Sequence, residues 1–133
     1  ETENGLRAIL NFGHTTGHAL EAISHYGKYL HGEAIAIGQV VAAKLSAQVL
    51  GLPASEVGRI ERLFRRAGLP TQLDLSAADK RKLLPAMKLD KKVSAGEIKF
   101  VLARRIGAIE FGHQVPAALL TAALNPQPST LNR

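Results

Sequence analysis

Residues 33–50 read EAIAIGQVVAAKLSAQVL, a run that is apolar on nearly every side when it is wound into a helix. The polar interruptions are few, mainly Gln39, Lys44, Ser46 and Gln48. Gly51 follows the run and supplies a helix stop signal. A helix that is apolar all round has to be enclosed by other elements. We therefore predict that residues 32–50 form a buried central helix, which makes the fold mainly α.

Four shorter helices are predicted around this one from periodicity, capping and turn signals. They cover residues 14–24, 53–67, 76–88 and 116–124. In the second of them, an apolar stripe is predicted to face the core, and four arginines lie mostly off it. The stripe consists of Ile60, Leu63, Phe64 and Ala67. Pro85 is predicted to break or kink the third.

The pattern changes in the last third of the chain. EIKFVLA at residues 97–103 alternates between apolar and polar side chains, and AIEF follows a glycine a few residues later. This predicts a short β strand pair near residues 97–111. The end of the chain, NPQPSTLNR at residues 125–133, has two prolines and little apolar content, so we expect a disordered tail there.

Composition narrows the possible chemistry. A chain of 133 residues with 46% hydrophobic content is enough for one core. It has no cysteine, so any metal must be held by imidazole or oxygen ligands. The start lacks the features of a signal peptide, and we find no window approaching the ~20 apolar residues of a membrane span. We expect a cytoplasmic protein, and the absence of an initial methionine suggests a piece of a longer one.

Positive charge is concentrated in the second half of the chain. Thirteen of the seventeen lysines and arginines lie between Arg59 and Arg105. One interpretation is a nucleic-acid footprint. The other is a solvated helix surface with a few cations that bind a phosphorylated substrate. We favour the second and expect no nucleic-acid partner, because the basic stripe has no interleaved aromatic residues and no recognisable binding motif.

Three histidines cluster with glycines early in the sequence. His14 and His18 are four residues apart on a predicted helix, so their side chains share one face and can meet one ion. His31 stands thirteen residues further on, at the start of the central helix. The cluster makes a metal or catalytic site about as probable as an ordinary structural role. His25 and His113 do not belong to this cluster, and we expect both to have a structural or surface role only.

These residues closely resemble a known family. ENGLRAILNFGHTTGHALEA, then YLHGEAIAIG, and later MKLDKKVSAGEIKFVL look like the C-terminal domain of 3-dehydroquinate synthase, an enzyme of the shikimate pathway. The resemblance covers residues 1 to about 124. It implies the helical domain of the dehydroquinate synthase-like fold in a metal- and NAD-dependent lyase. That enzyme converts 3-deoxy-D-arabino-heptulosonate 7-phosphate to 3-dehydroquinate and phosphate.

The resemblance also implies roles for individual residues. His14 and His31 match the family's metal ligands, with a glutamate from an upstream segment as the third, and the metal is Zn²⁺ or Co²⁺. His18 matches the group that faces the substrate for hydrogen bonding and proton transfer. Spacing alone would instead pair His14 with His18. Substrate-binding roles fall to Arg7, Asn11 and one of Lys91 and Lys92.

Two glutamates lie close in sequence to these histidines. Glu21 comes three residues after His18, and Glu33 comes two after His31. Either carboxylate could orient an imidazole by accepting a hydrogen bond from it. An exposed helix carboxylate without such a role is an equally good interpretation of both.

The cofactor requirement is only partly met by this sequence. It has no glycine-rich phosphate-binding loop and no alternation of strands and helices, so we expect the family's NAD-binding domain to precede residue 1. The chain is then a metal and substrate domain spanning residues 1–124, inactive alone and part of a homodimeric enzyme. Two alternatives stay open, a related sugar-phosphate cyclase or polyol dehydrogenase and a non-catalytic basic binding domain. Asn11 and the DKK motif favour dehydroquinate synthase.

Overall fold

The computed structural model describes residues 12–23, 29–73, 76–88 and 98–124. Within these ranges it contains five helices and two strands. The elements are α2 (His14–Ile23), α3 (His31–Leu50), α4 (Ala54–Arg66), α5 (Ala77–Lys88), β1 (Lys99–Arg105), β2 (Ala108–Gln114) and α6 (Ala117–Leu124). The predicted mainly α fold with one strand pair is confirmed. The expected tail at residues 125–133 lies outside the described residues.

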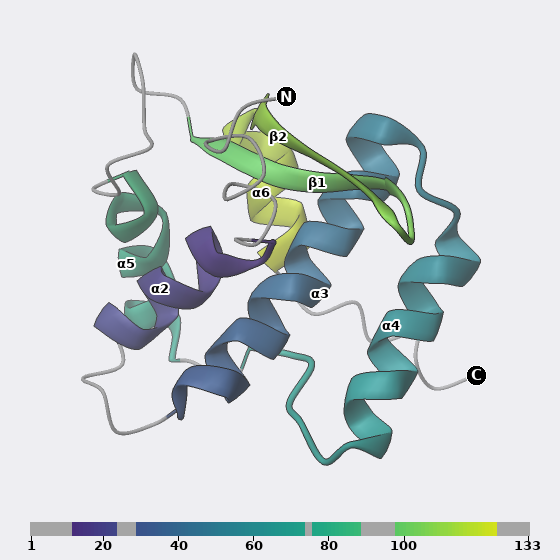
Figure 1. Ribbon diagram of the computed structural model, residues 1–133. Coiled ribbons are helices and arrows are strands. Elements are labelled where there is room, and N and C mark those ends of the chain that lie inside the picture. Colours follow the sequence, from purple (N-terminus) through teal and green to yellow (C-terminus); the bar gives the residue numbers. More distant parts are fainter. Residues whose placement is uncertain (1–11, 24–28, 74–75, 89–97, 125–133) are drawn as a thin grey trace, which may run out of the picture.

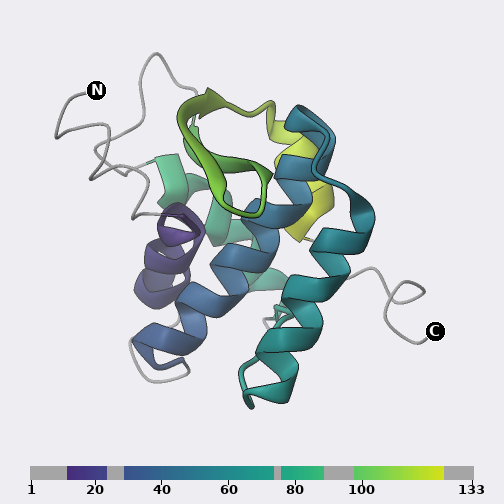
Figure 2. The same cartoon turned by 45° about the vertical axis from the view of Figure 1, so that its right-hand side comes forward.

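Helix α3 is the central element, as predicted. It contacts α2, α4, α6 and β1. Figure 1 shows it crossing the molecule diagonally, and the turned view in Figure 2 keeps α2 along one flank and α4 along the other. The helix ends at Gly51, which adopts a left-handed conformation (φ 79°) and donates its backbone N–H to the carbonyl of Ser46.

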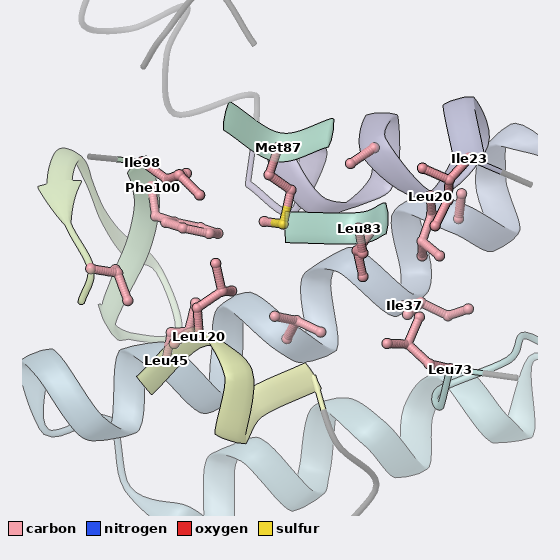
Figure 3. Close-up of a cluster of buried hydrophobic side chains, with 14 of the residues drawn as sticks. Leu20, Ile23, Ile37, Leu45, Leu73, Leu83, Met87, Ile98, Phe100 and Leu120 are labelled. Carbon is pink, nitrogen blue, oxygen red and sulfur yellow. The ribbon is translucent and has the colours of Figure 1, made fainter. Parts of the chain in front are cut away.

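The main hydrophobic core forms where α2, α3, α5, α6 and β1 meet. Its labelled side chains point toward one another in Figure 3. Its fully buried large members are Leu20, Ile37, Leu45, Leu83, Met87, Leu102 and Leu120. Each such side chain stabilises the fold by roughly 1.5–3 kcal/mol through removal of its apolar surface from water.

The length and composition of α3 correct one sequence expectation. His31–Leu50 is long and apolar enough to cross a membrane by those two criteria, with a mean hydropathy of 1.3 in its best window. However, 56% of that window is buried inside the structure, and the core helix of a globular fold passes the same test. Isoleucine, valine, leucine and alanine side chains supply the high mean hydropathy, but polar residues such as Gln39, Lys44 and Ser46 interrupt them, so the helix has no long unbroken apolar run. A count of consecutive apolar residues therefore did not identify α3 as a helix of this length and hydropathy.

The inward face of helix α4 overlaps only partly with its predicted stripe. Ile60 and Phe64 are half-buried, and Ile60 packs inward beside Val57. Val57 and Glu61 are the buried residues, whereas Leu63 is 64% exposed. Ala67, outside the helix, is also exposed. The helix is rotated because Val57 packs with Ala43 and Leu52 in a small second cluster against α3. Glu61 enters this interface as a result, and its Oε2 atom has no hydrogen-bond partner among the described residues.

The remaining sequence expectations concern α5 and the strand pair. Ser76 caps α5 by accepting a hydrogen bond from the backbone N–H of Asp79 at 3.1 Å. Pro85 lies inside this helix, which continues to Lys88, so the proline does not end it. Strands β1 and β2 form the predicted pair, which is antiparallel, and β2 runs three residues beyond the expected limit.

A buried serine joins α3 to the strand pair. The Ser46 hydroxyl donates to the carbonyl of Ala42 at 2.7 Å and accepts from the backbone N–H of Ala103 at 2.8 Å. Ala103 lies next to a register shift in the ladder between β1 and β2. The serine therefore satisfies a strand N–H from the helix side, although its sequence position looked like a mere polar interruption of α3.

Helices α2 and α3 approach each other through glycines. A Cβ on Gly38 would collide with the carbonyl oxygen of Gly13 and lie 3.0 Å from the backbone nitrogen of Gly17. One turn further along α2, a Cβ on Gly17 would lie 2.6 Å from Cδ1 of Ile35. The two backbones are in contact at this point, and the helices run antiparallel from it.

We expect Gly38→Ala to lower the free energy of unfolding by about 1–3 kcal/mol, because the new methyl group has to push apart two backbones. Gly32→Ala, in the same helix, is the matched control. A Cβ at Gly32 meets nothing within 4 Å, so this change should leave stability unchanged or raise it by up to about 1 kcal/mol. Urea unfolding followed by circular dichroism measures both. An equal loss of stability in Gly38→Ala and Gly32→Ala would contradict the close packing of α2 on α3 at Gly38.

Ser46→Ala should lower the free energy of unfolding by about 1–3 kcal/mol, because it leaves the buried N–H of Ala103 without an acceptor. The exposed Ser55 provides the comparison, and Ser55→Ala should change stability by less than about 0.5 kcal/mol. Thermal and urea unfolding of the two variants would be compared with the unmodified chain. A loss at Ser46 no larger than that at Ser55 would show that the bridge between α3 and β1 contributes nothing.

Candidate functional site

The exposed face of α2 carries two of the clustered histidines. His14, His18 and Glu21 are spaced i, i+4 and i+7, so they share one side of the helix. The opposite side is buried, with Thr16 and Ile23 facing the protein interior. This helix follows a turn at Gly13, whose φ of 83° favours glycine.

His31 is the first residue of α3 and is held by the local geometry of the helix start. The preceding residue, Leu30, is extended (φ −68°, ψ 157°). Its backbone N–H donates to Oε1 of Glu33 at 2.9 Å. Glu33 therefore caps the helix that carries His31 and also lies at the end of the helix dipole that favours negative charge.

The three imidazoles meet at the end of the α2 and α3 pair. The ring centroids of His14 and His18 are 5.0 Å apart, and those of His14 and His31 are 6.1 Å apart. His18 and His31 are separated by 6.2 Å. Since α2 and α3 run antiparallel from their glycine contact, the second turn of α2 arrives beside the start of α3. The predicted cluster of three histidines is thus present.

A carboxylate contacts one of these rings. Oε1 of Glu21 lies 3.0 Å from Nδ1 of His31, although the two residues belong to different helices. The Glu21 side chain is 19% exposed and that of His31 is 60% exposed. Of the two glutamates that the sequence put forward, Glu21 is therefore the one in contact with an imidazole. The side chain of Glu33 instead bonds the backbone.

The clustered side chains offer imidazole nitrogens, which are suitable ligands for a borderline divalent metal. Two imidazoles on one tetrahedral ion, with metal to nitrogen distances of about 2.0 Å, place their ring centroids roughly 5 Å apart. The separation of His14 and His18 matches that value, and the separations of His31 from His14 (6.1 Å) and His18 (6.2 Å) are about 1 Å longer. Among the described residues, no group of three or more histidine, cysteine or acidic side chains is arranged to hold a metal ion. A site built from two of these imidazoles and a ligand outside the described residues is compatible with the ring separations and with the absence of a complete set of three ligands among the described residues.

The structure does not describe the other predicted site residues. Arg7, Asn11, Lys91 and Lys92 lie outside the described residues, as does His25. Their predicted contacts with a substrate stay predictions.

His113 has an ordinary structural environment, which supports its expected role. Its Nε2 atom lies 2.8 Å from Oε1 of Glu110, and Arg104 donates to the same carboxylate from β1 at 2.8 Å. The hydrogen bond from Arg104, followed by the one from His113, lowers the pKa of Glu110 to about 2. This ion cluster belongs to the strand pair.

The basic residues of α4 lie on the protein surface. Arg59, Arg62, Arg65 and Arg66 are all exposed. Arg59 lies 3.5 Å from Glu56 in the same helix, and Arg65 donates to Thr71 at 3.4 Å. The solvated helix surface that we favoured from the sequence agrees with this exposure.

Comparison with known proteins gives a consistent family. Residues 1–93 match the model of the 3-dehydroquinate synthase C-terminal domain. The 3-dehydroquinate synthase of Acidithiobacillus ferrooxidans is 49% identical over 125 residues, covering 93% of this chain and 34% of that protein. The 3-dehydroquinate synthase of Bordetella pertussis is 52% identical over 108 residues, covering 80% of this chain and 29% of that protein.

The fold also has a solved counterpart. A crystal structure of 2-deoxy-scyllo-inosose synthase complexed with carbaglucose-6-phosphate, NAD⁺ and Co²⁺ matches with a TM-score of 0.74. The match covers 86% of this chain and 33% of that one, at 24% sequence identity, which supports the fold alone.

The sequence relatives identify the family, and the chain spans about a third of their length. Both histidine motifs, from Gly13 to His18 and from Leu30 to Glu33, fall inside the matched residues. This chain belongs to the family of 3-dehydroquinate synthase C-terminal domains.

Proposed function

We propose that the complete protein is a 3-dehydroquinate synthase, in which this chain provides the metal and substrate domain. The reaction converts 3-deoxy-D-arabino-heptulosonate 7-phosphate to 3-dehydroquinate and phosphate. The observation that carries the proposal is the convergence of His14, His18 and His31 in a chain of this family. The relatives named 3-dehydroquinate synthase share up to 52% of the aligned residues with it.

In this proposal His14 and His31 hold a divalent metal, Zn²⁺ or Co²⁺. Imidazole nitrogens are suitable ligands for both ions. The related fold of 2-deoxy-scyllo-inosose synthase was solved with Co²⁺ and NAD⁺, which supports the requirement for a metal and for NAD here. When bound, the metal supplies Lewis-acid stabilisation of negative charge on substrate oxygens, and NAD supplies a reversible hydride acceptor.

His18 is proposed to move protons at the substrate. It is exposed and its ring lies 5.0 Å from that of His14, so a substrate beside the metal would be within its reach. An imidazole accepts and donates protons near neutral pH, which is what general acid and base catalysis needs. Its place one turn after His14 on α2 brings the metal ligand and the proton-transfer group to the same side of the substrate.

The cations and the amide of the sequence motifs complete the proposed site. Arg7 and Asn11 bind the anionic parts of the substrate, and Lys91 or Lys92 adds a further positive charge. An anion such as phosphate is held well by charge-assisted hydrogen bonds from arginine and lysine. The exposed arginines of α4 are left out of the site in this proposal.

A related sugar-phosphate cyclase is the competing function. The structural match to 2-deoxy-scyllo-inosose synthase favours it, but that match has 24% identity. The dehydroquinate synthases are 41–52% identical. The higher sequence identity is our reason for preferring the heptulosonate phosphate as substrate.

We expect the 133-residue chain alone to show no turnover when NAD and Zn²⁺ are supplied, because it spans about a third of its relatives' length. A protein extended to that full length should release phosphate from the heptulosonate phosphate. In it, His18→Ala should lower kcat/KM by about 10²- to 10⁴-fold. Coupled detection of phosphate and of 3-dehydroquinate measures both. Preferential turnover of a different sugar phosphate would favour the competing cyclase. Near-normal activity of the 133-residue chain would contradict the requirement for a longer protein.

The metal ligands can be tested on this chain by titration with Co²⁺ followed by its visible absorption. Two imidazoles do not complete a structural tetrahedral site, so binding should be weak. His14→Ala and His31→Ala should each weaken it further by more than about tenfold. His18→Ala and the control His113→Ala should have little effect. Tight binding that depends on His18 but not on His31 would instead assign the metal to the His14 and His18 pair.

A further inference from the structure

We propose that Glu21 is a positioning residue, which holds His31 as the tautomer protonated on Nδ1. This deepens the proposed function and rests on it. The carboxylate oxygen Oε1 of Glu21 lies 3.0 Å from Nδ1 of His31. A carboxylate only accepts hydrogen bonds, so in a neutral imidazole the proton at this contact belongs to Nδ1. Nε2 then carries the lone pair and is the nitrogen available to a metal.

The burial of the two partners shows which one holds the other. The Glu21 side chain is 19% exposed and lies on a helix whose opposite face is embedded in the core. The His31 ring is 60% exposed. Few neighbours therefore limit how this ring rotates or which nitrogen carries its proton. The better-buried carboxylate is the fixed partner, and it determines the orientation and tautomer of the imidazole.

The two glutamates near His31 act on different parts of the residue. Glu33 accepts a hydrogen bond from the backbone N–H of Leu30 and so fixes the start of α3. Glu21 reaches across from α2 to the ring itself. Backbone position and ring orientation are consequently set by separate carboxylates, which can be substituted one at a time.

An ion pair that serves only to join α2 and α3 is the alternative. A contact with a ring this exposed contributes little to stability. The thermal midpoint therefore does not distinguish the two roles. The tautomer of His31 and the affinity for a metal do, because a purely structural contact has no reason to affect either strongly.

The first test is the tautomer of His31 in the 133-residue chain, read from its ring ¹⁵N chemical shifts without metal and with the imidazoles neutral. We expect the Nδ1–H form in the unmodified chain and in Glu21→Gln, whose amide oxygen still accepts the hydrogen bond. Glu21→Ala should shift His31 toward a mixture of both tautomers. Glu56→Gln removes a surface carboxylate on α4 and should change nothing. An Nε2–H tautomer in the unmodified chain, or no response to Glu21→Ala, overturns the proposal.

The second test is Co²⁺ affinity in the same variants. Glu21→Ala should weaken binding by about 10- to 100-fold, and Glu21→Gln should retain affinity within several-fold. If His31→Ala weakens binding while Glu21→Ala does not, the positioning role is wrong. If Glu21→Gln abolishes the Co²⁺ spectrum as completely as His31→Ala, Glu21 is itself a ligand and the proposal also fails. If neither His14→Ala nor His31→Ala affects binding, the proposed metal site fails, whereas the tautomer measurement still decides the role of Glu21.

Discussion

The contact between α2 and α3 at Gly13, Gly17 and Gly38 is the constraint on which the rest of the site depends. With no side chain at these positions, the backbones of the two helices touch. Because the helices run antiparallel from this point, the next turns of α2 lie beside the start of α3. Larger residues at the contact would move the helices apart, and the ring of His31 would no longer lie 6.1 Å from that of His14 and 6.2 Å from that of His18.

The two faces of α2 have different environments. One face packs into the core shared with α3 and α5, and Leu20 is fully buried there. The other face carries His14, His18 and Glu21, of which His18 is exposed and the other two are half-buried. Because the core holds the backbone of α2, the positions from which His14, His18 and Glu21 project are fixed. His31 lies at the first residue of α3, and its ring is exposed. Glu21 contacts this ring, and Glu33 fixes the start of the helix by accepting a hydrogen bond from the backbone of Leu30.

Several structural features were predictable from the sequence because each depends on local chemistry. The all-round apolar run identified α3 as the central helix, and Gly51 marked its end. Alternation of side chains indicated β1 and β2, and Ser76 with Asp79 marked the start of α5. The face that α4 turns inward was predicted only in part, because Ile60 packs inward as expected but Leu63 is exposed. It depends on the surface that α3 offers to Val57, and the sequence of α4 contains no information about that surface.

The sequence motifs by themselves indicated the family and pointed to three histidines, which the structure brings together. Spacing could not choose between His18 and His31 as the partner of His14, because i, i+4 proximity is local and contact between helices is not. The two glutamates were equally good candidates in the sequence. Only the tertiary structure separated them, since the packing of α2 on α3 brings Glu21 to the ring of His31 and leaves Glu33 to cap its own helix.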